Sequence, residues 1–174
     1  LFVNKLITSN LMIYIKEKQH HFLRNVMRVK INDSINIFDG KTGEWSSQVL
    51  SINRDNTVLR VNKKIKNMIS NHDVWLVFAP IKQSRMNIAI QKATELGVSK
   101  VIPCFTEYTN IRSIKTNNLK LNAVEAAEQS ERLEIPKIET PIEIQLLLKT
   151  WPNDRYLVYC DEKINKKNNL LDSL

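Results

Sequence analysis

The stretch "AIQKATELGVSKVIPCF", residues 89–105, decides the fold class. Its first half has the character of a helix end, and Gly97 is a helix stop that favours the left-handed conformation. The apolar run "KVIPCF" that follows is typical of a strand buried on both faces, and "VWLVFAP" at 74–80 is a similar run just before the helix. The order strand, helix, strand predicts a parallel α/β sheet, which binds ligands at the carboxyl ends of its strands. The chain has only three glycines and no glycine-rich phosphate loop, so no motif marks the ligand position.

The rest of the second half extends this pattern. Ser84 is placed to cap a helix over 85–96, and a second helix is expected over 121–133. Thr140 begins a capping box that predicts a third helix. The run "YLVYCDE" at 156–162 predicts a third strand.

The first third of the chain has a different style. Short strands are expected at 11–16, 35–40, 44–53 and 57–65, with one helix over 17–29. Short strands joined by tight turns predict a small β-barrel. The fold class is therefore α/β plus all-β, with a barrel domain at 1–66, a polar linker at 67–72 and an α/β domain at 73–174.

Positive charge is concentrated in the barrel domain. The whole chain has a net charge of +8, and residues 1–66 hold 12 Lys/Arg against 5 Asp/Glu, a net of +7. This asymmetry favours a nucleic-acid partner. The alternative is a genome that enriches lysine everywhere, but residues 67–174 carry enough acid to leave a net of only +1.

Several classes of protein lack support in the sequence. No apolar run approaches the ~18 residues of a membrane span, and polar residues interrupt the N-terminal stretch, which makes a poor signal peptide. Cys104 and Cys160 lie in apolar runs, which predicts two buried thiols in a reducing cytoplasm. No metal site, Ser-His-Asp spacing or P-loop is present.

Arginines of the barrel helix are the first candidates for a function. Arg24 and Arg28 are four residues apart, so one side of a helix would present both, and guanidinium suits phosphate oxygens. His20 and His21 could assist them. The alternative is a solvated helix face.

Charged residues of the α/β half are further candidates. Lys82 and Arg85 follow the first α/β strand, where cations oppose the helix dipole, which suggests an external anion. Gln129 and Arg132 could point into a cleft, although Arg132 could simply pair with Glu128. Glu95 could be a general base or could pair with Lys92.

Three segments together resemble the RsmE family of ribosomal RNA methyltransferases of the SPOUT class. They are "HHFLRNVMRVKINDSINIFDGKTGEWSSQVL" at 20–50, "QKATELGVSKVIPCF" at 91–105 and "AAEQSERLEIPKIETP" at 126–141. The resemblance covers roughly residues 11–162. It implies an N-terminal PUA-like RNA-binding barrel, followed by the first part of a trefoil-knot α/β domain that binds S-adenosyl-L-methionine. The implied reaction is N3-methylation of a uridine in 16S rRNA by a cytoplasmic homodimer that acts on the rRNA or the 30S subunit, with no metal and no membrane.

The resemblance also assigns candidate residues. RNA contacts are expected from Arg24, Arg28, Lys82, Arg85, Gln129 and Arg132. Cys160, Asp161 and Glu162 are expected to border the cofactor cavity, and no catalytic residue is named. The family's "GPEGG" loop and "LRTETA" segment do not occur in the sequence, so the chain is expected to be truncated before the knot and to bind the cofactor poorly. The alternative function is a non-catalytic RNA-binding fragment.

Overall fold

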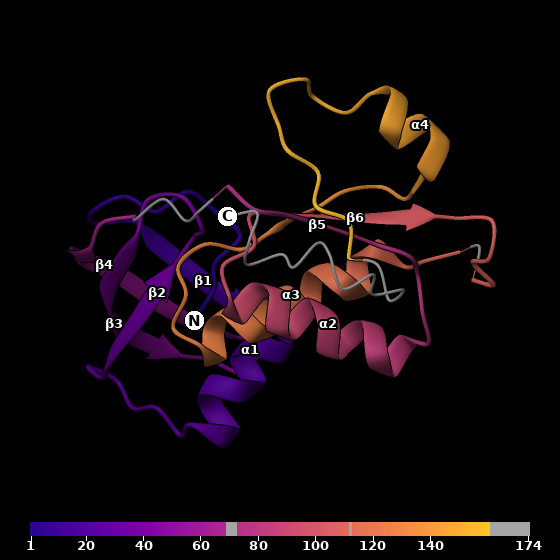
Figure 1. Cartoon of the computed structure of the whole chain (residues 1–174). Coiled ribbons are helices and arrows are strands. Elements are labelled where there is room, and N and C mark those ends of the chain that lie inside the picture. The colour runs from indigo at the N-terminus through magenta and orange to yellow at the C-terminus, as the bar shows by residue number, and fades with distance from the viewer. Residues whose placement is uncertain (69–72, 112, 161–174) are drawn as a thin grey trace.

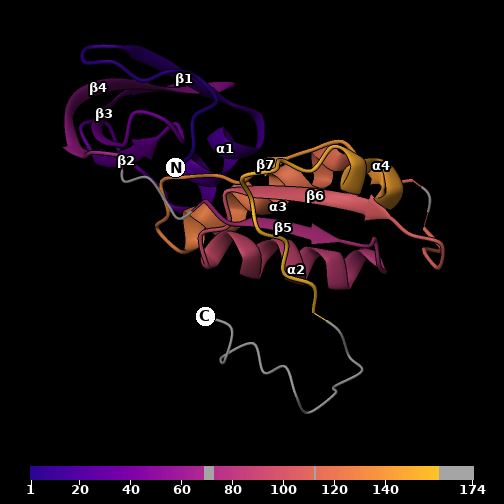
Figure 2. The same ribbon diagram turned by 45° about the horizontal axis from the view of Figure 1, so that its top comes forward.

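The computed structural model describes residues 1–68, 73–111 and 113–160. They form two parts, an N-terminal sheet with short helical turns and a C-terminal α/β unit (Figures 1 and 2). The N-terminal elements are β1 (Met12–Lys16), α1 (Glu17–His21), the π-helix η1 (Phe22–Val26), β2 (Ser34–Phe38), β3 (Glu44–Ile52) and β4 (Asn56–Lys66). The C-terminal elements are β5 (Trp75–Phe78), α2 (Gln83–Glu95), β6 (Lys100–Phe105), α3 (Thr116–Gln129), β7 (Lys137–Ile138), β8 (Ile142–Glu143) and α4 (Ile144–Lys149).

The N-terminal sheet is antiparallel, with the strand order β1-β4-β3-β2. Side chains alternate between its two faces, as the period of two in a strand requires. The inward residues of all four strands pack with Val3, Ile7 and Leu23, so the N-terminal segment and η1 cover the inner face. A parallel bridge joins Phe2 to Phe38 of β2. The predicted strands are confirmed, and in the described part of the chain their pairings do not close into a ring.

The prediction of one regular α-helix over 17–29 is wrong. The α-helix lasts only through His21 and passes into a π-helix, where the Met27 amide donates to the Phe22 carbonyl at 2.9 Å, five residues back. Arg28 then has a φ of +54°, in the left-handed region. Arg24 and Arg28 therefore do not share one face of a regular helix.

Asp39 organises the turn between β2 and β3. This buried carboxylate accepts hydrogen bonds from the backbone N–H groups of Ile7, Lys41 and Thr42, and from the Thr42 hydroxyl. Burial by itself opposes ionisation of Asp39, but these hydrogen bonds outweigh it and hold its pKa below the ordinary 3.8. One side chain thus ties the turn to the N-terminal segment.

The C-terminal sheet is parallel and has helices on both faces. β5 pairs with β6, while β7 and β8 pair with successive parts of β6. One face packs against α2 and α3 through a core that includes Met86, Ile90 and Leu119. The other face packs against α4 through Leu147, which gives three layers (Figure 1). The predicted α/β class is confirmed.

Three local predictions in this half are wrong. Lys82 precedes α2 without a side-chain cap, and Ser84 lies inside the helix. Thr140 caps nothing, because residues 142–143 pair with β6 as β8 and the helix begins only at Ile144. Residues 156–160 form no strand, since an apolar run becomes a strand only where a partner lies alongside, and Tyr156 is 97% exposed. Residues 161–162 of that predicted strand lie outside the described residues.

The two parts of the molecule meet at the N-terminal segment. The Phe2 amide donates to Glu128 Oε1 of α3 at 2.7 Å, and Gln19 Nε2 donates to the Phe2 carbonyl at 2.8 Å. The segment is therefore held from both sides, by α1 and by α3. No helix within the described ranges is long and apolar enough to cross a membrane.

Candidate nucleic-acid interface

Arg24 is fixed to the turn between β3 and β4. Its Nη1 lies 3.4 Å from the carbonyl oxygens of both Asn53 and Arg54. His20, four residues earlier, is buried, with Nδ1 2.9 Å from Thr57 Oγ1 and Nε2 3.2 Å from the Arg54 carbonyl. His20 is thus an anchor of α1 and not a surface contact. Arg24 remains exposed and has guanidinium donors beyond the Nη1 that makes these bonds.

Arg28 lies beyond the end of η1 and is exposed. Its left-handed backbone is uncommon for a residue with a long side chain, and such conformations cluster at functional sites. Exposed apolar side chains of Phe22, Val26 and Met27 surround this segment in sequence. The segment therefore offers solvent both cationic and apolar groups.

Lys82 and Arg85 are both exposed where β5 leads into α2. The first turn of α2 contains no acidic residue, so nothing there offsets the positive end of the helix dipole. Because β5 is parallel to β6, this position lies at the carboxyl edge of the sheet.

Gln129 is the last residue of α3, and Arg132 follows it in the loop. Arg132 lies beside the C-terminal end of α2, the end opposite to Lys82 and Arg85. Arg132 Nε donates to the Glu95 carbonyl near the C-terminus of that helix. Ten residues separate Arg85 from Glu95, which corresponds to about 15 Å of helix. The structure therefore does not bring the predicted RNA contacts of this half into one cluster. Gln129 is exposed at the end of α3.

The position of Arg132 also explains why residue 97 is a glycine. Gly97 has a φ of +85°, and a Cβ placed on it would lie 2.5 Å from Arg132 Nη1. The guanidinium occupies the space that a side chain at 97 would need. Arg132 thus holds the end of α2 against the end of α3.

Glu95 does not have the environment of a general base. Its carboxylate bonds to Lys92 Nζ at 2.7 Å and to Gln91 Nε2 at 2.8 Å. The Lys92 bond, followed by the Gln91 bond, lowers the Glu95 pKa, whereas a base working near neutral pH needs a raised one. The alternative interpretation, pairing with Lys92, is confirmed.

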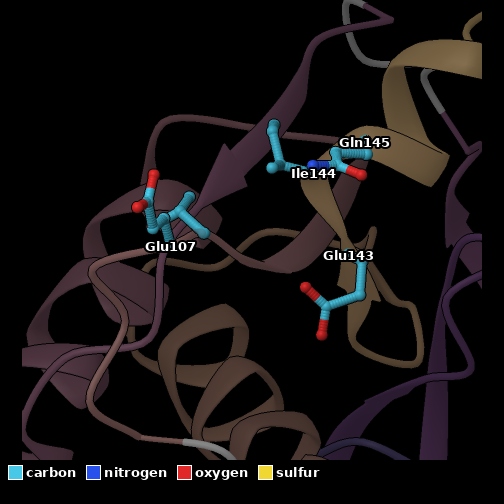
Figure 3. Close-up of a pocket in the computed structure, with 5 residues that line it drawn as sticks. Glu107, Glu143, Ile144 and Gln145 are labelled. Carbon is cyan, nitrogen blue, oxygen red and sulfur yellow. The ribbon is translucent and has the colours of Figure 1, made fainter.

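An open pocket of about 400 Å³ lies at the carboxyl ends of β6 and β8. Its lining residues are Thr106, Glu107, Glu143, Ile144 and Gln145. Figure 3 shows Glu107 and Glu143 on opposite sides of it. None of the five was predicted as a site residue from the sequence, although Thr106 directly follows the strand 100–105.

The predicted cofactor segment is described only at its start. Cys160 is exposed, which contradicts the expected buried thiol, while Cys104 is buried and both cysteines are free. Leu157, Val158 and Tyr159 are exposed as well, so the described residues form no cradle around Cys160. Asp161 and Glu162 lie outside the described residues. The described ranges contain no group of residues that could hold a metal ion.

Comparison with known proteins shows which protein family the chain belongs to. A family model described as an RNA methyltransferase domain matches residues 69–174, and one described as an RNA methyltransferase PUA domain matches residues 15–62. The chain is thus an RNA methyltransferase chain with a PUA domain. It belongs to the ribosomal RNA small subunit methyltransferase E family, the family that the sequence resembles.

Relatives and solved structures agree with this membership. The family member of Rickettsia conorii is 34% identical over 172 residues, which cover 98% of this chain and 70% of the relative. The family member of Buchnera aphidicola subsp. Schizaphis graminum is 28% identical over 170 residues, which cover 91% of this chain and 68% of the relative. The structure of the Neisseria gonorrhoeae enzyme bound to S-adenosyl methionine aligns with a TM-score of 0.79 at 19% identity, covering 88% of this chain and 66% of that one. The structure of a probable rRNA methyltransferase from Porphyromonas gingivalis aligns with a TM-score of 0.76 at 24% identity, covering 87% of this chain and 66% of that one. The chain therefore spans about two thirds of the length of these proteins.

Proposed function

We propose that this protein takes part in S-adenosyl-L-methionine-dependent N3-methylation of a uridine in 16S rRNA. The family membership of nearly the whole chain carries this proposal. The product differs from the substrate by one methyl group in place of the N3 hydrogen. The methyl donor supplies the activated group when bound, and the protein orients the nucleotide.

RNA is held, in this proposal, by the positively charged N-terminal part. Arg24 and Arg28 are its phosphate contacts, since both are exposed and lie on the segment that follows α1. Lys82 and Arg85 extend the contact to the carboxyl edge of the parallel sheet, where a nucleotide would meet the α/β part. Gln129 is a weaker candidate because it lies at the opposite end of α2 from Arg85.

Arg132 acts mainly through the fold. It is half-buried and bonds to a backbone carbonyl of another helix, so its main effect is to position α2 and α3. The segment at Cys160 does not fit a nucleoside cofactor as described, because its apolar side chains are exposed instead of enclosing a cavity. We derive no cofactor contact from it.

The proposed activity is tested on the modified nucleotide itself. Small ribosomal subunits that lack the N3-methyluridine are incubated with the protein and isotope-labelled S-adenosyl-L-methionine, and the rRNA is digested and analysed by mass spectrometry. Labelled N3-methyluridine is the expected product. RNA binding without any methyl incorporation would instead support the alternative, a non-catalytic RNA-binding protein.

We further propose that the protein acts in the cytoplasm, where ribosomal subunits are assembled, and as a homodimer. The exposed Leu146 on α4, at 53%, supports a subunit contact on this layer. Light scattering after size exclusion should give twice the chain mass, 40.6 kDa from 20.3 kDa per chain. A monomer at tens of micromolar would contradict the dimer and leave the catalytic proposal standing.

A further inference from the structure

The outer face of the N-terminal sheet carries a continuous row of side chains across all four strands. Met12 of β1 is opposite Arg60 of β4, Arg60 is opposite Gln48 of β3, and Gln48 is opposite Ser34 of β2. Directly paired residues share a face of the sheet, so the four side chains lie side by side. The core packs on the other face, which leaves this row toward solvent.

Arg60 is oriented but still has donors to offer. Its Nη2 donates to Gln48 Oε1 at 3.3 Å, and Gln48 Nε2 donates to Asn32 Oδ1 at 3.5 Å. Gln48 is neutral, so the charge of Arg60 is not cancelled by it. An exposed guanidinium with five donors, only one of which this bond uses, can contact phosphate and base edges.

Tyr14 places an aromatic ring beside this row. It lies two residues from Met12 on β1, on the same face, and is diagonal to Arg60 across the strand pair. Its side chain is 60% exposed, although an aromatic ring of this size is usually placed against other residues. The opposing residue, Val58, is 7% exposed, which gives the ring a flat apolar base.

The charge of the same face is positive. Lys16 lies two residues beyond Tyr14 on β1 and is exposed. The carboxylate of Glu44, on the outer face of β3, is 3.1 Å from Lys66 Nζ and also accepts from Asn36 Nδ2. The surface therefore combines an exposed aromatic ring, a guanidinium and amide or hydroxyl groups in a positive field. A ring for base stacking and cations for the backbone are what an unpaired nucleotide strand requires.

We infer that the outer face of β1 and β4, centred on Tyr14 and Arg60, binds single-stranded RNA by stacking an unpaired base on Tyr14. This rests on the proposed function, in which RNA is the substrate, and adds a second RNA surface to the one that carries Arg24 and Arg28. The two surfaces separate two tasks: the helical segment contacts phosphates, and the sheet face recognises a region without base pairs. The protein would thereby favour rRNA whose target region is unpaired.

The test compares one substitution on two forms of RNA. Affinities of wild-type protein, Tyr14→Ser and Tyr14→Phe are measured by fluorescence anisotropy for two RNAs. One is a single-stranded ten-nucleotide oligouridylate, and the other is an RNA hairpin whose stem is fully paired and whose loop is a linker without bases. Tyr14→Ser should weaken single-strand binding by about 5-fold to about 150-fold, the range expected for loss of one stacked base. Hairpin binding should change by less than about twofold, because paired bases cannot reach the ring.

Tyr14→Phe is the matched control, since it keeps the ring and loses only the hydroxyl. It should bind the single strand within about twofold of wild type, because stacking needs only the π-face of the ring. Tyr14→Ser loses the contact of the ring with Val58, so its melting temperature should fall slightly. A cooperative melt well above the assay temperature excludes unfolding as the cause of weaker binding. Ultraviolet cross-linking to the single strand should label the peptide that contains Tyr14.

Three outcomes would overturn the inference. They are equal single-strand affinity for Tyr14→Ser and wild type, an equal loss for the hairpin, and loss of a protein dimer in Tyr14→Ser with RNA affinity unchanged. In the first case the Arg24→Ala, Arg28→Ala variant still tests the proposed function, because it should weaken both RNA forms. A wild-type protein that binds neither form would remove both proposals.

Discussion

At the scale of single residues, Gly97 is a position where a small change should lower stability. It needs a left-handed backbone, which costs other residues about 1–2 kcal/mol, and a side chain there would meet the Arg132 guanidinium. Gly97→Ala should therefore lower the free energy of unfolding by about 2–3 kcal/mol. Urea denaturation of Gly97→Ala, Arg132→Ala and the double variant separates the two causes, since the steric part should vanish when Arg132 is removed. Equal losses with and without Arg132 would show that Arg132 does not occupy this space.

Asp39 should make stability depend on pH. Its pKa lies below the ordinary 3.8 in the folded protein, so its contribution is present above that value and is lost as the pH falls through the folded pKa. Asp39→Asn should cost about 1–3 kcal/mol near neutral pH, because the carboxylate accepts several hydrogen bonds. The difference between variant and wild type should shrink below about pH 3.8, measured by denaturation at a series of pH values. A difference that stays constant across this range would contradict the assigned role.

At the scale of elements, α4 packs against the sheet mainly through one leucine, Leu147. Leu147 is 7% exposed against the sheet, whereas its neighbour Leu148 is 51% exposed. Leu147→Ala should lower the free energy of unfolding by about 2–4 kcal/mol. Leu148→Ala, the matched control with the same change in volume, should cost less than about 0.5 kcal/mol. Similar losses in both variants would mean that the helix packs through a different face.

The same scale shows where the sequence could and could not predict the fold. Continuous apolar runs at 74–80 and 100–105 predicted β5 and β6, because burial on both faces leaves no room for polar residues. The π-helix after His21 was not predictable, since it shares the apolar spacing of an α-helix and differs by one residue in its hydrogen bonds. Thr140 shows a different kind of failure. The local sequence after Thr140 is typical of a helix start, but Ile142 pairs with Cys104 of β6 instead, and this contact comes from a distant part of the chain.

Among the candidate site residues, the sequence indicated positions better than roles. Arg24 and Arg28 are exposed as expected, but the conformations that separate them arise from the π-helix and the left-handed turn. Arg132 was expected to point into a cleft or to pair with Glu128, and instead bonds to the end of α2. An arginine can donate to a carbonyl at the end of a neighbouring helix, and the sequence does not show which helix will lie beside it. The boundaries at 66 and 73 stay a prediction.

At the scale of the whole molecule, the two parts are coupled through the N-terminal segment. Glu128 of α3 accepts from the Phe2 amide, while α1 holds the same residue from the other side. Glu128→Ala should lower the free energy of unfolding by about 1–3 kcal/mol, since a half-buried amide loses a charged acceptor. Glu128→Gln, which keeps an acceptor oxygen, should lose less. Equal losses in the two variants, measured by urea denaturation, would show that the hydrogen bond does not join the parts.

The central claim is that the N-terminal part, with its net charge of +7, holds the RNA. Its most direct test is the salt dependence of rRNA binding by wild type, by Arg24→Ala, Arg28→Ala, and by a control that removes two exposed lysines of the α/β part, Lys115→Ala, Lys120→Ala. Log affinity should fall linearly with log salt, by about 0.7 for each single-strand phosphate contact. The arginine variant should flatten that slope by about 1.4, and the lysine control should leave it unchanged. A wild-type slope near zero, or equal flattening in both double variants, would contradict the account.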